Sequence, residues 1–330
     1  MLRTTAELEA QAGAKPAAID LKVIDHLDAH ARRWLCASPL AFAGFSDEQC
    51  IDATIVGGDP GFALALDEKQ LRLPLAALDD PEQARQGRGV GLLFLIPGMG
   101  ETLRVNGRVA SAEGDAIVVT VQECYLHCAK ALLRSDFWQP APPPAADVTD
   151  FLQSSRFMAL ATADARLNTD LSPKGDPAGL LVQPFEGGIR FADRPGNRRT
   201  DSFRNILARP QASALFIVPG CTRVACAQGE AGISADPQSR QPFTVRDKTP
   251  KLVGSIASPF IALRESAALA RANPWVGQAP PADIDPAAIF AAHVRLHKAG
   301  GLGAIVAKGL VAVPGLMRKS LESDYKRNLY

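Results

Sequence analysis

The chain has 330 residues, of which 47% are hydrophobic and 22% charged, and its formal net charge is +1. This length accommodates two domains with buried cores. The near-zero charge excludes nucleic acid as the main partner, because a DNA-binding surface usually shows as a basic excess. The apolar stretch 300–317 contains several glycines and Pro314, so we expect no membrane span. Six sparse cysteines behind a mixed polar N-terminus predict a cytoplasmic protein with reduced thiols.

The first part of the chain is predicted to be rich in strands. Residues 1–19 are Ala-rich and are expected to be a flexible N-terminus, and the apolar spacing from Asp20 to Arg33 predicts an amphipathic helix. A second helix is predicted over Tyr125–Trp138, and the Pro-rich segment 141–147 reads as a linker. Between the helices, short apolar runs punctuated by Gly and Pro predict an antiparallel barrel or sandwich; these runs are 40–44, 51–56, 62–66, 71–73, 91–96, 102–109 and 116–121.

The pattern then repeats. Residues 91–98 (GLLFLIPG) match 213–220 (SALFIVPG) at a shift of 122, and 131–138 match 268–275 at a shift of 137. Upstream, Gly58-Asp59-Pro60 matches Gly175-Asp176-Pro177. Matches that keep their order indicate a tandem duplication. The offset between matching positions rises from 122 to 137, which predicts an extra segment near Ser239–Val253 of the second copy.

The repeat gives the domain organisation. We expect copy one over residues 20–140, copy two over 148–278, and a C-terminal helical extension over 279–330. The predicted fold class is mainly β with flanking helices (α+β), in which two related barrels pack as an internal pseudo-dimer.

Copy two contains a stretch whose layout suits a phosphate group. The apolar run Gly188–Ala192 reads as a strand, Pro195-Gly196 as a turn, and a helix is expected to begin shortly after. Arg198 and Arg199, with nearby hydroxyls, supply charge and donors beside a helix N-terminus. Copy one has Asp79 and Asp80 in this place. The alternative reading is a solvated basic turn.

Copy one keeps a different polar set. Thr102, Arg104, Asn106 and Arg108 alternate along one strand face, and their counterparts are Val224, Cys226, Gln228 and Glu230. His127, Lys130 and Arg134 are placed on one helix face, and their counterparts are Arg264, Ala267 and Arg271. This complementary loss predicts one composite site where the copies meet. The alternative is that both sets are solvated faces that drifted independently.

Four motifs resemble those of the pyridoxamine 5'-phosphate oxidase-like proteins, the FMN-binding split β-barrel superfamily. They are Ser-Pro-Lys-Gly-Asp at 172–176, Arg-Pro-Gly-Asn-Arg-Arg at 194–199, Glu-Thr-Leu-Arg-Val-Asn-Gly-Arg at 101–108, and Tyr-Leu-His-Cys-Ala-Lys-Ala-Leu at 125–132. The resemblance implies two tandem split β-barrels with FMN at their interface. Because copy one lacks the phosphate turn, we expect one FMN per chain.

The resemblance also implies roles for individual residues. Arg198 and Arg199 would hold the FMN phosphate, with Ser172 and Lys174 close by, while the partner barrel covers the ring system. The predicted cofactor-binding residues are Glu101, Thr102, Arg104, Asn106, Arg108, Ser172, Lys174, Arg194, Asn197, Arg198, Arg199 and Ser202, and the predicted catalytic residues are His127 and Lys130.

The predicted function is that of an FMN-dependent oxidoreductase taking a hydride from NAD(P)H or a small-molecule substrate. A cation from Arg104, Arg108 or Lys130 would stabilise reduced flavin, and His127 would handle a proton because its pKa lies near neutrality. The alternative is a non-catalytic flavin or haem carrier. No metal is expected, because Cys124, His127 and Cys128 lack a second ligand pair at zinc spacing. Oligomerisation beyond the internal pseudo-dimer is compatible with this reading.

Overall fold

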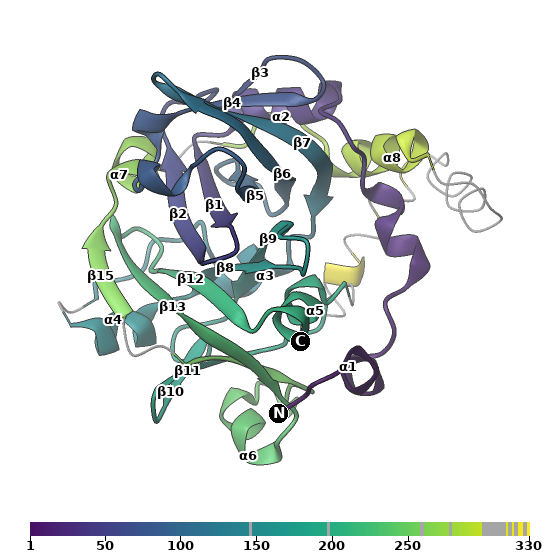
Figure 1. Cartoon of the computed structure of the whole chain (residues 1–330). Coiled ribbons are helices and arrows are strands. Elements are labelled where there is room, and N and C mark those ends of the chain that lie inside the picture. The colour runs from purple at the N-terminus through teal and green to yellow at the C-terminus, as the bar shows by residue number, and fades with distance from the viewer. Residues whose placement is uncertain are drawn as a thin grey trace.

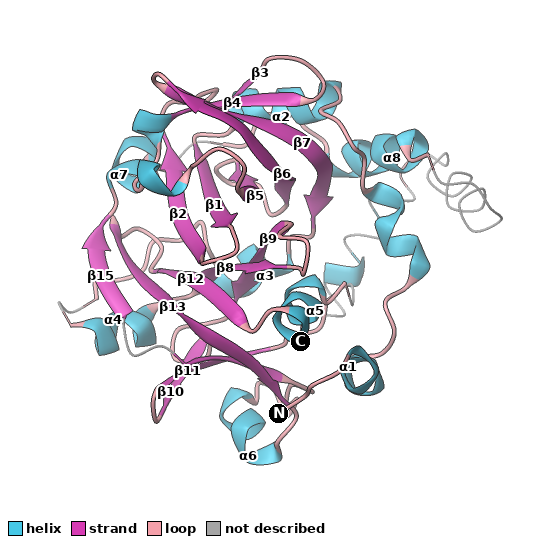
Figure 2. Cartoon of the chain, viewed as in Figure 1, coloured by secondary structure: helices cyan, strands magenta, loops and turns pink. Residues whose placement is uncertain are grey.

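Two antiparallel sheets with flanking helices make up the computed structural model of the chain (Figures 1 and 2). The structure describes residues 1–144, 147–196, 199–257, 261–276, 279–298, 315, 319, 323–325, 329 and 330. Each sheet belongs to one copy of the repeat, so the predicted fold class, mainly β with two tandem split barrels packed as a pseudo-dimer, is confirmed. Within these ranges, no helix is long and apolar enough to cross a membrane.

Copy one forms a seven-stranded sheet in the order β2-β1-β5-β6-β7-β4-β3. Its strands lie where apolar runs were predicted, at β1 (Leu40–Ser46), β2 (Ile51–Gly57), β3 (Leu64–Ala65), β4 (Gln70–Pro74), β5 (Gly89–Leu95), β6 (Thr102–Glu113) and β7 (Ala116–His127). The helical elements around it are η1 (Ala17–Lys22), α2 (Ala29–Ala37), η2 (Leu75–Ala77), η3 (Pro81–Gln83) and α3 (Lys130–Ser135).

Copy two forms an eight-stranded sheet in which β10-β11-β14-β13-β12-β8-β9 are neighbours and β15 pairs with β13. The strands are β8 (Phe157–Ala163), β9 (Thr169–Gly175), β10 (Val182–Phe185), β11 (Gly188–Ala192), β12 (Gln211–Ile217), β13 (Arg223–Ser234), β14 (Val253–Ala257) and β15 (Ile261–Glu265). The helical elements are α4 (Val148–Ser154), α5 (Asp201–Ala208), α6 (Pro237–Arg240), η4 (Gln241–Phe243) and α7 (Ala267–Ala272). The extra segment lies between β13 and β14, as the repeat predicted.

One contact is made twice, once by each copy. A Cβ at Gly57 of β2 would lie 2.4 Å from the carbonyl oxygen of Ala268 on α7, and a Cβ at Gly175 of β9 would lie 1.9 Å from that of Ala131 on α3. In both places a strand of one copy passes directly over the helix of the other, and only glycine leaves room for it. Gly57 is therefore the counterpart of Gly175, one residue earlier than the Gly-Asp-Pro match places it.

The copies share part of their core. Each barrel has an apolar core of its own, and a third cluster combines residues of both. Phe157 of copy two is its centre, with its ring centroid 5.2 Å from that of Phe42 and 4.9 Å from that of Phe137. The pseudo-dimer is thus held by a continuous apolar interface.

The two ends of the chain pack on the barrels. Where the sequence predicts a flexible N-terminus, α1 (Thr5–Ala12) starts with a capping box between Thr4 and Glu7, and Leu8 is fully buried in the core of copy two. In the extension, α8 (Pro286–Leu296) packs on copy one beside η1 and β7 (Figure 1).

Two predicted helices are shorter than expected. The stretch Asp20–Arg33 is divided between η1 and α2. Strand β7 continues to His127, which pairs with Thr102, so only Lys130–Ser135 of the second stretch is helical. His127 therefore lies at a strand end and does not share a helix face with Lys130 and Arg134, because the ladder with β6 satisfies its backbone in the extended form.

Candidate functional site

A cavity of about 660 Å³ lies where the two copies meet. Copy one contributes side chains from β6, the end of β7 and α3, and copy two contributes β9, β11 and the start of α5. Eight Lys and Arg side chains line it against four Asp, so the cavity is strongly cationic although the chain as a whole is nearly neutral.

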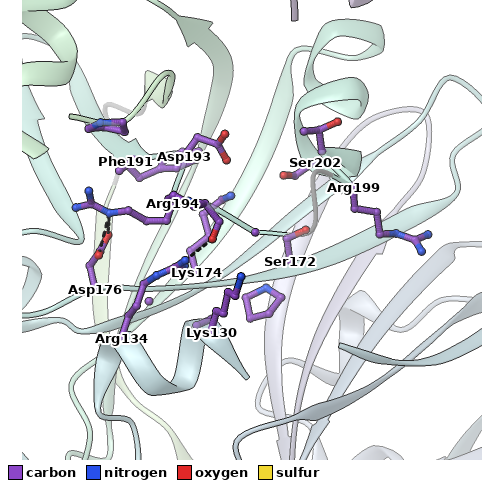
Figure 3. Close-up of a pocket in the computed structure, with 18 of the residues that line it drawn as sticks. Lys130, Arg134, Ser172, Lys174, Asp176, Phe191, Asp193, Arg194, Arg199 and Ser202 are labelled. Carbon is purple, nitrogen blue, oxygen red and sulfur yellow. Dashed lines mark hydrogen bonds and ion pairs between the residues drawn. The ribbon is translucent and has the colours of Figure 1, made fainter. Parts of the chain in front are cut away.

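Three cations gather on one side of the pocket. Figure 3 shows Arg134, Lys174 and Arg194 together there, with Ser172, Ser202 and Arg199 on the other side. Arg194 Nε donates to both carboxylate oxygens of Asp176, at 2.9 and 2.7 Å. Its Nη2 is buried and has no hydrogen-bond partner in the described part of the chain. A buried guanidinium with a spare donor is suited to an anion.

The carboxylates on this side are perturbed by burial. Burial raises the pKa of Asp176 to about 6, although Arg194 pulls it the other way. Burial likewise raises the pKa of Asp193 and lowers that of Lys174. The Lys174 ammonium lies 5.4 and 5.0 Å from the ring centroids of Phe191 and Phe203. Burial thus weakens the negative countercharge on this side of the cavity.

Arg104 joins the two copies at the back of the cavity. It is 1% exposed, forms an ion pair with Asp170, and donates to the carbonyl of Leu171 and, at 2.9 Å, to the hydroxyl of Tyr125. Ser172 Oγ donates to the same Asp170 at 2.8 Å. A strand residue of copy one is therefore fixed by a strand of copy two, and its charge cannot move away from the cavity.

Arg199 is engaged differently from the prediction. Its guanidinium pairs with Asp201 and, at 3.2 Å, with Asp20, and it lies 4.5 Å from the ring centroid of Tyr125. It lines the cavity, but two carboxylates already balance its charge. Arg134, which sequence reasoning left out of the cofactor-binding set, takes the position beside Lys174 and Arg194.

The predicted catalytic pair also lines the cavity. Burial, and then the charges of Arg104 and Lys22, hold the pKa of His127 well below its usual value, so the imidazole is neutral at physiological pH. Its Nδ1 is buried without a hydrogen-bond partner among the described residues. The expectation of a pKa near neutrality therefore does not fit this position. Lys130 is 4% exposed, and its Nζ pairs with Asp324 at 2.8 Å.

Four predicted residues do not line the cavity. Glu101 accepts from the Tyr325 hydroxyl, Asn106 donates to Glu123, Arg108 donates to the Gly87 carbonyl, and Thr102 is buried. Beyond Arg104, Arg108 also donates to the Arg166 carbonyl of copy two, and the ladder shifts register after Asn106. Asn197 and Arg198 lie outside the described residues. The structure thus brings together Arg104, His127, Lys130, Ser172, Lys174, Arg194, Arg199 and Ser202.

At the equivalent junction on the other side of the pseudo-dimer, here called the closed or sealed junction, charged side chains bind one another and the backbone. Asp79 accepts hydrogen bonds from the Ser266 hydroxyl and, at 2.8 Å, from the Ala268 amide at the start of α7. Arg264 pairs with Asp80, and Arg271 donates to the carbonyls of Gly57 and Ala77 at 3.2 and 3.0 Å. Each charge there has a protein partner. No group of three or more potential metal ligands occurs anywhere in the described ranges.

The fold and the site together define a duplicated split-barrel protein with one cationic cavity between its copies. Residues 145–273 match the family model of pyridoxamine 5'-phosphate oxidase, so the second copy is a pyridoxamine 5'-phosphate oxidase-like domain and the resemblance is confirmed.

Several solved structures are also similar to part of the chain. HupZ from Group A Streptococcus is 18% identical over 36% of this chain and 92% of its own, with a TM-score of 0.30. General Stress Protein 26 from Bacillus anthracis str. Sterne is 16% identical over 35% and 89%, with a TM-score of 0.28. HutZ, the haem storage protein from Vibrio cholerae, is 12% identical over 38% and 95%, with a TM-score of 0.27. A search of curated proteins finds no significant match.

Proposed function

We propose that the chain binds one FMN in the cavity between its copies and is an FMN-dependent oxidoreductase. The observation that carries the proposal is the cationic cavity itself, which combines Arg134, Lys174 and Arg194 of two different copies around one space. Its volume of about 660 Å³ falls within the usual range for ligand pockets, about 300–1,000 Å³.

The donors fit the two ends of a flavin mononucleotide. A phosphate dianion takes charge-assisted hydrogen bonds best from guanidinium groups, and Arg194 Nη2 is a buried donor with no partner within the described residues. At the other end, Arg104 is a fixed cation and His127 presents an unpartnered Nδ1.

Bound FMN would supply hydride and electron transfer. Arg104 would present a guanidinium at a fixed point, because Leu171 and Tyr125 orient it and Asp170 both orients it and balances its charge. Lys130 would add a second cation from α3. His127 is neutral, so it would hold a hydrogen bond at Nδ1 and would not donate a proton from an imidazolium. NAD(P)H or a small organic molecule would be the electron donor.

The test uses a matched pair of variants. Arg134 on α3 and Arg271 on α7 occupy equivalent positions in the two copies. We expect Arg134→Ala to weaken FMN binding about 10- to 100-fold, the cost of a charged hydrogen bond, and Arg271→Ala to leave it unchanged. Quenching of FMN fluorescence measures both affinities. Equal effects of the two variants, or no FMN binding by the unmodified protein, would refute the proposal.

A second readout separates an enzyme from a carrier. An oxidoreductase bleaches the flavin absorbance when NAD(P)H is added without oxygen, whereas a flavin carrier does not. A haem carrier is the second candidate, because a neutral His127 with a free ring nitrogen is in the state that binds haem iron. A Soret band that is lost in His127→Ala would favour it.

A further inference from the structure

The C-terminal tail, here the described residues 323–325, 329 and 330, lies against the same cavity. Its first part rests on α3. Asp324 pairs with Lys130 Nζ at 2.8 Å, and the Tyr325 hydroxyl donates to Glu101 at 2.9 Å and accepts from the Ala129 amide at 3.3 Å. The tail therefore contacts copy one at the helix that supplies two of the cavity's cations.

The second part of the tail covers the cationic side of the cavity. The Leu329 carbonyl accepts from Arg134 Nε at 2.5 Å, and the main-chain oxygen of Tyr330 accepts from Lys248 Nζ at 2.8 Å. The Tyr330 ring centroid lies 5.7 Å from the guanidinium of Arg134 and 5.6 Å from that of Arg194. A side-chain carboxylate, two main-chain oxygens and a ring face thus occupy groups that an anion would use.

The closed junction shows that only part of this arrangement is required by the fold. Arg134 Nη2 donates to the Pro195 carbonyl, as Arg271 Nη2 donates to the Ala77 carbonyl in the other junction. In the closed junction, however, the Nε bond goes to Gly57 of the facing barrel, whereas Arg134 Nε reaches the tail. The tail thus takes a donor that the fold itself satisfies in the other copy.

We propose that the tail is an intramolecular competitor for the anionic ligand of this cavity, covering its cations until a phosphate-bearing ligand displaces it. The proposal rests on the proposed function for the identity of that ligand. Lys130 and Arg134 are nearly buried, and a buried cation without a countercharge is unfavourable. The tail supplies that countercharge when no ligand is bound.

The tail is also easy to displace. Asp324 keeps 45% of its side chain exposed, so water competes for its carboxylate even though Lys130 is buried. A phosphate dianion makes shorter, charge-assisted hydrogen bonds to two guanidinium groups. The ligand binds only those molecules whose tail has left the cavity, so the apparent affinity is the intrinsic affinity multiplied by that fraction. Weakening the tail contacts should therefore tighten binding by roughly three- to tenfold.

The first experiment measures FMN affinity on the full chain by fluorescence quenching. Asp324→Asn and Tyr330→Ala are each expected to tighten binding, and the double variant should tighten it most. Asp283→Asn, which removes an exposed carboxylate paired with Arg33 away from the cavity, is the matched control and should have no effect. Unchanged or weaker binding in both tail variants would overturn the proposal, because the tail would then be neutral or part of the ligand site.

The second experiment does not require flavin. The chain has three tyrosines, Tyr125, Tyr325 and Tyr330, so 3-fluorotyrosine labelling gives three ¹⁹F signals that single Tyr→Phe variants assign. Inorganic phosphate should shift the Tyr330 signal toward that of a solvent-exposed ring. The Asp283→Asn variant should show the same shift as the unmodified protein. If phosphate shifts the Tyr330 signal but FMN does not bind, the result supports competition by the tail and refutes FMN as the ligand. If FMN binds tightly but the Tyr330 signal does not shift, the result supports FMN as the ligand and refutes competition by the tail.

Discussion

The two junctions between the barrels are built from equivalent elements and have opposite electrostatics. In one junction, Asp79 and Asp80 of copy one neutralise Arg264 and cap α7, and Arg271 donates to two backbone carbonyls. In the other, Arg134, Lys174 and Arg194 face a cavity in which burial raises the pKa of Asp176 and of Asp193. Substitutions at equivalent positions thus distinguish a cationic cavity from a junction whose charges are paired within the protein.

The two junctions differ in which part of the protein supplies the partners of their basic side chains. In the sealed junction, every arginine named above has its partner in the facing barrel. In the open one, Arg104 is satisfied by the facing barrel but Lys130 depends on the tail. We therefore expect cations paired with the facing barrel to contribute to stability, and the cation paired with the tail to contribute to ligand binding.

The largest expected effect is on Arg104. Arg104→Ala leaves Asp170, which is 6% exposed, without its ion-pair partner inside the protein. Removing one partner of a buried pair should lower the free energy of unfolding by about 3–5 kcal/mol. The equivalent change Cys226→Ala should cost about 1 kcal/mol or less, because the side chain is small and partly exposed. Urea titrations measure both, and equal losses would contradict the comparison.

The next effect is a pH dependence. Because the folded-state pKa of Asp176 is raised from 3.8 to about 6, the folded protein binds more protons than the unfolded chain between these values. Its contribution to stability is complete below pH 4 and is lost as the pH rises through 6, a loss on the order of 3 kcal/mol. Asp176→Asn removes the titration. The difference in unfolding free energy between the two proteins, measured from pH 4 to 7, should fall with rising pH, and a constant difference would contradict the assignment.

The glycine pair tests the pseudo-symmetry. Gly175→Ala and Gly57→Ala each place a methyl group against a facing helix carbonyl, so both should lower the unfolding free energy by about 1–3 kcal/mol. Only Gly175→Ala should also weaken ligand binding, because Gly175 lines the cavity next to Lys174. Thermal melts and FMN titrations of the two variants separate these effects. Loss of binding in both would show that the junctions are not independent.

The smallest effect is expected in the sealed junction. Asp79→Ala removes the acceptor for the Ala268 amide and the Ser266 hydroxyl and one ion-pair partner of Arg264, which keeps its pair with Asp80. The loss of such a helix cap should lower the unfolding free energy by about 1 kcal/mol. FMN affinity should stay as in the unmodified protein, since this residue is remote from the cavity. A change in affinity without a change in stability would be the contrary result.

The sequence predicts the strands and the repeat well, because both depend on local patterns. Apolar runs between Gly and Pro reappear as strands, and the conservative match of 91–98 with 213–220 reappears as β5 and β12. The helix predicted at Tyr125 begins five residues later, because an apolar stretch has the same composition whether it extends a ladder or starts a helix.

The site is less accessible to sequence reasoning. Alternation correctly places Arg104 on a polar face, but it cannot tell that Asn106 of that face binds Glu123 and that Arg108 binds backbone carbonyls. Asp20 becomes a partner of Arg199 only through the path of the N-terminal segment, whereas Asp201 is a local partner two residues further along the chain. Tyr330 has no local signal at all, since its position depends on a contact with residues nearly 200 positions away.

The interface around Phe42, Phe137 and Phe157 packs together two halves that belong to one covalent chain. In an assembly of two identical subunits, any mutation is present twice and changes both binding sites together. Here each substitution is made once, so an acidic pair can arise at one interface while arginines persist at the other. Fusion therefore makes it possible for one interface to specialise in holding the molecule together while the other stays available for a ligand.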